Sequence, residues 1–125
     1  ARQSQRSAPE APSQPQLNTA TALNANTVRE TWTAPASTGG SPILDYRVYR
    51  GSTSAMPCDG TTLVSTVSAS TFTFDHTGLS QATTYYVRVL AENGAGASPC
   101  APPASATTGS APTQPQGASA SPGAT

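Results

Sequence analysis

The sequence has no lysine, one histidine and two cysteines, and its six arginines are balanced by six acidic residues, so the formal net charge is zero. A neutral chain has no electrostatic footprint for nucleic acid or for an anionic membrane surface. No apolar run approaches the roughly 20 residues that a membrane-spanning helix needs, and no signal peptide is recognisable. We therefore expect neither nucleic-acid binding nor membrane insertion.

Residues that perform catalysis or hold metal ions are also scarce. Two thiols and one histidine match no zinc pattern, the carboxylates show no calcium-loop spacing, and the glycines form no phosphate-binding motif. His76 follows Asp75, but neighbouring residues of a strand point to opposite faces, so this pair cannot belong to one catalytic triad. We expect no enzyme, no cofactor and no metal, and we expect His76 to be an ordinary exposed polar residue.

Large apolar side chains are missing from both ends. All aromatic residues lie between Trp32 and Tyr86, which predicts the core there, whereas residues 1–13 and 109–125 are rich in Pro, Ser, Gln and Ala. Such segments cannot offset their ordering entropy, so we expect linkers that flank one domain over residues 14–108. Their Ser and Thr are candidate O-glycan sites. Because the sequence starts with Ala1 rather than methionine, we expect a processed chain or part of a longer one.

The predicted domain shows β periodicity and no helical periodicity. Within residues 78–96, Tyr85, Val87 and Val89 alternate with Tyr86 and Arg88, which is typical of a half-buried strand. Gly/Pro turn signals separate further short strands. The seven predicted strands cover residues 14–23 (with Leu17 as its anchor), 26–33, 43–50, 63–67, 71–75, the middle of 78–96, and 104–108. Seven short strands favour an antiparallel sandwich.

Three segments resemble the fibronectin type III family: TVRETWTAP its B strand, SPILDYRVYRG its C strand, and GLSQATTYYVRVLAENGAG its E–F corner, F strand and F–G loop. The resemblance implies an all-β fold, a two-sheet antiparallel immunoglobulin-like sandwich of seven strands. It places Trp32 between the sheets and makes Tyr85 the "tyrosine corner", with its hydroxyl bound to nearby backbone. Tyr46 and Val87 are further expected core residues.

Glu30 departs from the family pattern. If Val28 and Trp32 face inward, Glu30 does too, because residues two apart on a strand share a face. One explanation is a bulge or strand edge where Glu30 reaches solvent. The other is a docking position for an arginine, in the same chain or in a neighbouring one. If Glu30 faces the core, we expect Glu30→Leu to stabilise the domain.

Four further residues are candidates for an interface. The outward faces of the C and F strands, which are neighbours in the family, carry Arg47, Tyr49, Tyr86 and Arg88. An Arg/Tyr surface can anchor a protein partner. The alternative is a solvated sheet face with cation–π contacts.

Cys58 and Cys100 are expected to form a disulfide, because the chain has an even number of cysteines and an apparently extracellular character. In the family, the strands next to them lie at opposite edges of one sheet. The loop that carries Cys58 must therefore cross over the sheet to reach Cys100.

The two tails contain a similar short sequence. Residues 12–21 read PSQPQLNTAT and residues 112–121 read PTQPQGASAS, an offset of 100, about the length of one family domain with its linker. Residue 112 onward is either the start of a following domain in a tandem array or a coincidence between two biased tracts. Gly117 in the place of Leu17 counts against the array, because the strand anchor would be lost.

Three classes of function remain. The first is a structural spacer module in a secreted or cell-surface multidomain protein of bacterial type, whose partners are neighbouring domains. The second is an extracellular filament whose identical subunits pair through the N-terminal segment. The third is recognition of a protein or carbohydrate, which the loops ASTGGSPI and ENGAGASP support least because they carry no aromatic or arginine anchors.

Overall fold

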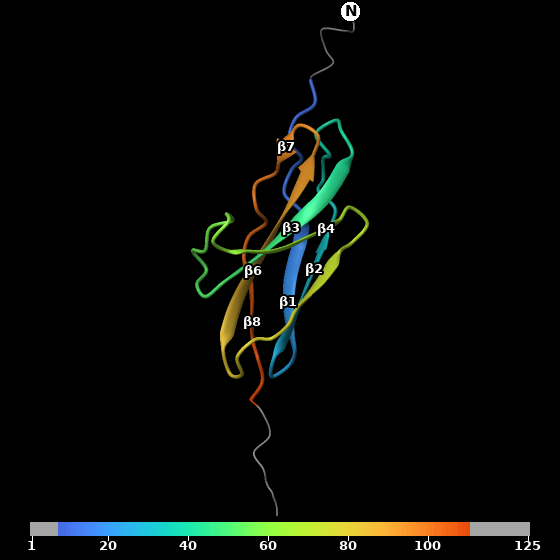
Figure 1. Ribbon diagram of the computed structural model, residues 1–125. Coiled ribbons are helices and arrows are strands. Elements are labelled where there is room, and N and C mark those ends of the chain that lie inside the picture. Colours follow the sequence, from blue (N-terminus) through green and yellow to red (C-terminus); the bar gives the residue numbers. More distant parts are fainter. Residues whose placement is uncertain (1–7, 111–125) are drawn as a thin grey trace, which may run out of the picture.

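The structure is a computed structural model that describes residues 8–110. Within this range it contains eight strands and no helix, arranged as two packed antiparallel sheets, so the predicted all-β sandwich is confirmed (Figure 1). The strands are β1 (Gln16–Asn24), β2 (Thr27–Thr33), β3 (Ile43–Gly51), β4 (Leu63–Ser68), β5 (Thr73–His76), β6 (Thr84–Asn93), β7 (Gly96–Ala97) and β8 (Ala104–Thr107).

Predictions for residues 1–7 and 111–125, which include the repeated sequence in the second tail and most of the candidate glycan sites, lie outside the described residues. Among the residues that are described, no helix is long and apolar enough to cross a membrane.

The first sheet has the order β1-β2-β5. In the second, β4 forms one edge beside β3, and β6 pairs with β3 on one side and with β7 and β8 on the other. The predicted last strand, residues 104–108, corresponds to β8, and the two-residue β7 is an additional strand in the region that we expected to be a turn. Pro99, Pro102 and Pro103 lie between them, and proline lacks the N–H that would continue the ladder.

The core lies between the sheets, as the family resemblance implied, and within the range of the aromatic residues. Trp32 of β2, Tyr46 of β3 and Val87 of β6 are all buried, and the rings of Trp32 and Tyr46 lie 5.6 Å apart between centroids. Tyr85 is half-buried, and its hydroxyl oxygen accepts a hydrogen bond of 2.9 Å from the backbone N–H of Ser80. The tyrosine corner implied by the family resemblance is therefore present.

The anchor that we expected for the first strand is wrong. Leu17 is 74% exposed and has a φ of +53°, at a register shift between β1 and β2. Pro15 is buried instead, and the side-chain amide of Asn18 donates to the carbonyl oxygens of Val87 (3.0 Å) and Pro102 (3.1 Å). Strand β1 is therefore held by a proline and an amide, and the leucine lies on the outside of a bulge.

Replacement of Leu17 by glycine should leave the free energy of unfolding unchanged or raise it by up to about 1 kcal/mol. A positive φ costs an L-residue about 1–2 kcal/mol, which exceeds the roughly 0.5–1 kcal/mol of extra chain entropy that glycine brings to the unfolded state. Leu23→Gly, in the same strand but without a positive φ, is the matched control and should destabilise. Urea unfolding of the three proteins measures this. Equal losses in both variants would contradict it.

Candidate functional site

A chain of three polar side chains crosses the interior between the two sheets. The guanidinium of Arg50 on β3 lies 3.1 Å from Nδ1 of His76 on β5, and Nε2 of His76 lies 2.9 Å from Oε1 of Glu30 on β2. The side chains of Glu30 and His76 are both 0% exposed. We call these three residues the buried polar chain.

Strand pairing explains how the buried polar chain forms. Val28 pairs with His76 and Glu30 pairs with Phe74, so Glu30 and His76 are diagonal neighbours on the inner face. The rings of Phe74 and His76 make an edge-to-face contact, with 4.9 Å between their centroids.

Two expectations are therefore wrong. His76 is buried rather than exposed, and Glu30 lies neither at a bulge nor at an edge that reaches solvent. The alternative of an arginine partner holds only indirectly, because Arg50 reaches Glu30 through His76. As Glu30 is fully buried, it is not part of an exposed interface.

The protonation of this chain follows from its donors. Arginine can only donate, so Nδ1 of His76 accepts and Nε2–H donates to Glu30. Burial, helped by the charge of Arg50, lowers the pKa of His76 to about 4, and burial raises the pKa of Glu30 to about 9. At neutral pH both groups are uncharged, which avoids the cost of an ion pair without water.

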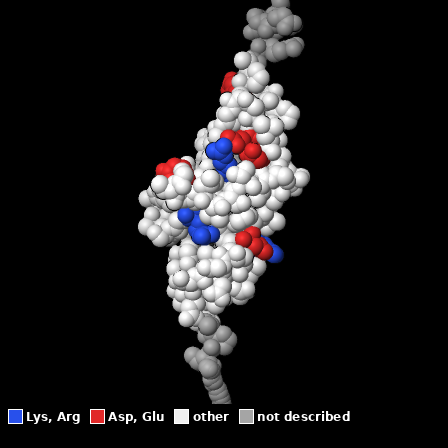
Figure 2. All heavy atoms as spheres, in the orientation of Figure 1, with Lys and Arg blue, Asp and Glu red and all other residues white. Residues whose placement is uncertain are grey.

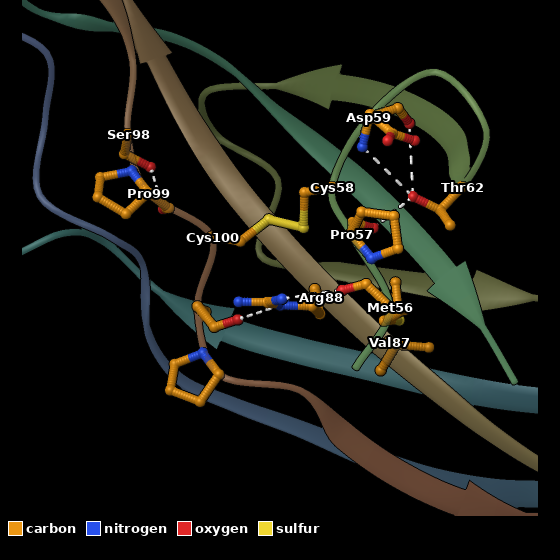
Figure 3. Close-up of a disulfide and its surroundings, with 12 residues drawn as sticks. Met56, Pro57, Cys58, Asp59, Thr62, Val87, Arg88, Ser98, Pro99 and Cys100 are labelled. Atoms are coloured by element: carbon orange, nitrogen blue, oxygen red, sulfur yellow. Dashed lines mark hydrogen bonds between the residues drawn. A yellow bond between two sulfur atoms is a disulfide. The ribbon is translucent and has the colours of Figure 1, made fainter. Parts of the chain in front are cut away.

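The outer face of the second sheet is covered by a loop and not by another sheet. Residues 52–62 fold over β3 and β6, and the disulfide between Cys58 and Cys100 joins this loop to the segment between β7 and β8 (Figure 3). The Cα atoms of the two cysteines are 6.6 Å apart. The predicted disulfide is confirmed, and the loop does cross the sheet.

Arg88 links the same two segments. Its Nε donates to the carbonyl oxygen of Ala101 (2.9 Å) and one terminal nitrogen donates to that of Met56 (3.0 Å), beside the disulfide (Figure 3). Arginine and disulfide therefore act in parallel, one by hydrogen bonds and the other covalently. Together they close residues 52–62 onto the sheet; we call these residues the closed loop.

The Arg/Tyr surface that we proposed as an interface is mostly covered by the closed loop. Tyr49 is only 3% exposed and packs with Met56 and Leu90, while Tyr86 packs against the edge of this cluster. Arg88 is occupied as described above. Alternation correctly placed these residues on the outer face, but it carries no information about a loop folding over that face.

Arg47 is the member of the proposed set that stays on the surface. Its guanidinium pairs with Glu92 at 2.8 Å, and a hydrogen bond with Asp45 raises the pKa of that glutamate. On the face seen in Figure 2, charges of both signs lie in small groups without an extended patch of either sign. Residues 8–110 contain no group of three His, Cys, Asp or Glu that could hold a metal ion.

Sequence reasoning missed two members of these sites that it could have found. Arg50 lies two residues after Val48 and four after Tyr46, so the alternation that points those side chains inward includes it. In the same way, His76 shares the inward parity of Phe74. Met56, by contrast, lies in an irregular loop and had no periodic signal.

The buried polar chain makes stability depend on pH. Glutamate and histidine in the unfolded chain have pKa values of 4.5 and 6.5. Between these values His76 holds a proton in the unfolded chain and Glu30 holds one in the folded chain, so the effects cancel. Between pH 6.5 and about 9 only folded Glu30 holds a proton, so stability should fall as pH rises, by up to about 1.4 kcal/mol per unit.

Glu30→Gln should abolish the loss of stability between pH 6.5 and 9, because the amide oxygen still accepts from His76 but does not titrate. At pH 6 we expect it to cost about 1 kcal/mol. Glu30→Leu would leave the N–H of His76 without an acceptor, so the gain first expected from it does not follow. Urea unfolding at pH 6, 7.5 and 9 measures the slope, and Glu10→Gln, on the surface, is the control. A parent protein whose stability is constant over this range would mean that folded Glu30 is ionised.

Removal of the disulfide by Cys58→Ala with Cys100→Ala should cost roughly 3–4 kcal/mol, the chain-entropy value for a separation of 42 residues. The closed loop should open, because only non-covalent contacts then hold it, among them the hydrogen bonds of Arg88 and the packing of Met56 on Tyr49 and Leu90. Hydrogen exchange at the amide of Met56, a buried residue of the loop whose N–H donates to Thr53, should become faster as the loop leaves the sheet. A loss below about 1 kcal/mol with that amide still protected would show that the loop closes without the disulfide.

Comparisons with known proteins agree with this architecture. The family model "Fibronectin type III domain" matches residues 13–107. A crystal structure of titin domains is similar with a TM-score of 0.69 and 30% identity over 79% of this chain and 32% of that one. The structure of titin kinase with its flanking domains is similar with a TM-score of 0.68 and 30% identity, over 79% of this chain and 17% of that one.

A solution structure of the sixth fibronectin type III domain of human fibronectin type III domain containing protein 3 gives a TM-score of 0.63 and 26% identity over 86% of this chain and 92% of that one. This chain therefore spans less than a third of the titin structures but nearly all of the single-domain one. No curated protein sequence matches it. Because the family model covers most of the chain, the chain belongs to the fibronectin type III domain family.

Proposed function

We propose that this chain is a non-catalytic spacer module of an extracellular multidomain protein, with neighbouring domains as its partners. The observation that carries the proposal is the position of the described ends, which leave the sandwich at opposite poles (Figure 1). A module threaded in this way adds its whole length to a row of domains. Domains of this family are typically structural modules of multidomain proteins.

Two features support the extracellular and non-catalytic parts of the proposal. A disulfide persists in oxidising surroundings and is rare in reducing ones. The titratable pair Glu30 and His76 is sealed between the sheets, so neither group can reach a substrate while the sandwich is closed.

The alternatives have less support. Donation of the N-terminal segment to another subunit would require β1 to leave β2, with which it pairs along most of its length. Recognition of a ligand would use loops 36–41 and 93–97 at one pole, and these loops would have to be free of contacts within the domain. Asn93 instead donates to the carbonyl oxygens of Thr38 (2.6 Å) and Glu10 (2.7 Å), which ties these loops to each other and to the chain before β1.

Sedimentation of the full chain, and of chains lacking residues 1–7 or 111–125, tests the proposal. We expect monomers at every concentration and melting temperatures within about 2 °C of one another, because these deletions leave all eight described strands intact. Assembly that grows with concentration and disappears on either deletion would favour the filament instead.

A further inference from the structure

Residues 10–21, which lead into β1 and include its first six residues, are bound to the domain; we call them the leading segment. The N–H of Glu10 donates to the carbonyl oxygen of Gly39 (2.8 Å), and its own carbonyl oxygen accepts from Asn93. Both contacts use backbone atoms of Glu10. Gly39 has a φ of +77°, and a methyl group added there would overlap the carbonyl oxygen of Glu10, so the site is shaped for a passing backbone.

Other contacts of the leading segment depend on specific side chains. Pro12 and Pro15 are buried. The hydroxyl of Ser13 accepts from the N–H of Ser37 (2.9 Å), and the side-chain amide of Gln16 donates to the carbonyl oxygen of Ala34 (3.3 Å). The site therefore requires two prolines, a hydroxyl and a glutamine at fixed spacing.

Residues 110–116 read SAPTQPQ, and residues 10–16 read EAPSQPQ. Both prolines and both glutamines are identical, and Thr113 keeps the hydroxyl of Ser13. Ser110 replaces Glu10, whose contacts need only backbone atoms. The repeated sequence therefore keeps the side chains by which the leading segment binds. A chance similarity between two Pro/Gln-rich tracts would not be expected to keep them.

The substitution that argued against the repeat from sequence alone now argues for it. Leu17 is exposed and has a positive φ, and Gly117 is the residue that suits this conformation best. Ser119 keeps the hydroxyl by which Thr19 contacts Thr31. Ala118 lacks the amide of Asn18, and Pro122 stands where Ala22 pairs with Val28, so the correspondence covers residues 110–121.

At the other pole the chain is held up to Gly109. The N–H of Gly109 donates to the carbonyl oxygen of Asn24 (3.3 Å), and its carbonyl oxygen accepts from Ala82 (3.0 Å). The hydroxyl of Thr108 donates to the carbonyl oxygen of Ser80 (2.7 Å). The last residue held by this domain, Gly109, is thus followed at once by Ser110, the counterpart of Glu10.

We propose that residues 110–121 are the leading segment of a following domain of the same kind, and that the two domains meet without a free linker residue. This rests on the proposed spacer function and specifies its junction. The turns at residues 24–27 and 78–83 would face loops 36–41 and 93–97 of the next domain. These four segments contain no charged residue. Ser110 replaces the acidic Glu10, whose charge would be desolvated between the poles.

A two-copy chain tests the junction: residues 1–121 followed directly by residues 22–125, so that the second domain uses residues 110–121 as its leading segment. The control has a Gly/Ser insert between Gly109 and Ser110. Residual dipolar couplings of both domains should fit one common alignment tensor in the direct chain and separate tensors in the control. The amide of Ser110 should be protected from exchange in the direct chain, as that of Glu10 is in the first domain.

A second two-copy chain, residues 1–110 followed by 11–125, separates the possible failures. If both domains of the first chain fold but orient independently, the close junction is wrong and the spacer function stands. If the second domain folds only with the leading segment from residues 11–21, the repeat is a coincidence and the tandem form of the spacer function falls with it. Exchange of segments between separate chains, seen as dimers that grow with concentration, would also overturn the junction.

Discussion

The hydrogen-bonded pairing of β6 with β3 on one side, and with β7 and β8 on the other, is the constraint on which the rest of the structure depends. The strand spans the sandwich from pole to pole. Tyr85 near its start forms the corner with Ser80, and Asn93 at its end binds the turn after it and the chain before β1. One straight backbone therefore sets the distance between the place where the chain arrives and the place where it leaves.

The inner and outer faces of this sheet are filled in different ways. Inside, Val48, Val89 and Ala91 pack against Trp32 and Tyr46, and the buried polar chain completes the interior without a net charge on Glu30 or His76. An apolar replacement of one partner leaves the other unsatisfied, so such a network persists even where it adds little stability. Outside, the sheet gains a second apolar cluster only because the closed loop is joined to it by the disulfide and by Arg88.

Period-two alternation grouped Tyr46 with Val48 and Val87 with Val89, because a strand fixes which side chains share a face, and the family resemblance placed Trp32 between the sheets. The predictions failed where other physics decides. His76 looked like a surface residue because histidine is usually polar and exposed, although its parity with Phe74 pointed inward. Tyr49 was assigned to an open face because no pattern reports a loop folding over it. Leu17 was taken as an anchor because it is apolar, but backbone geometry at a bulge decides its position.

The two poles explain why such a sandwich suits a structural role better than a binding role. Ligand-binding loops need exposed anchors and freedom to adapt, but here the side chain of Asn93 donates to the carbonyl oxygen of Thr38 in one loop and accepts from the N–H groups of Ala95 and Gly96 in the other. The opposite pole is likewise occupied with holding Thr108 and Gly109. The side chains at these poles are already ordered in the single domain, so their conformational entropy is lost on folding and not on docking. The residues there are small and neutral, so they do not hinder the close approach of a neighbouring domain. Little further ordering is then required when a neighbour docks, which favours a stiff row of domains over a flexible string.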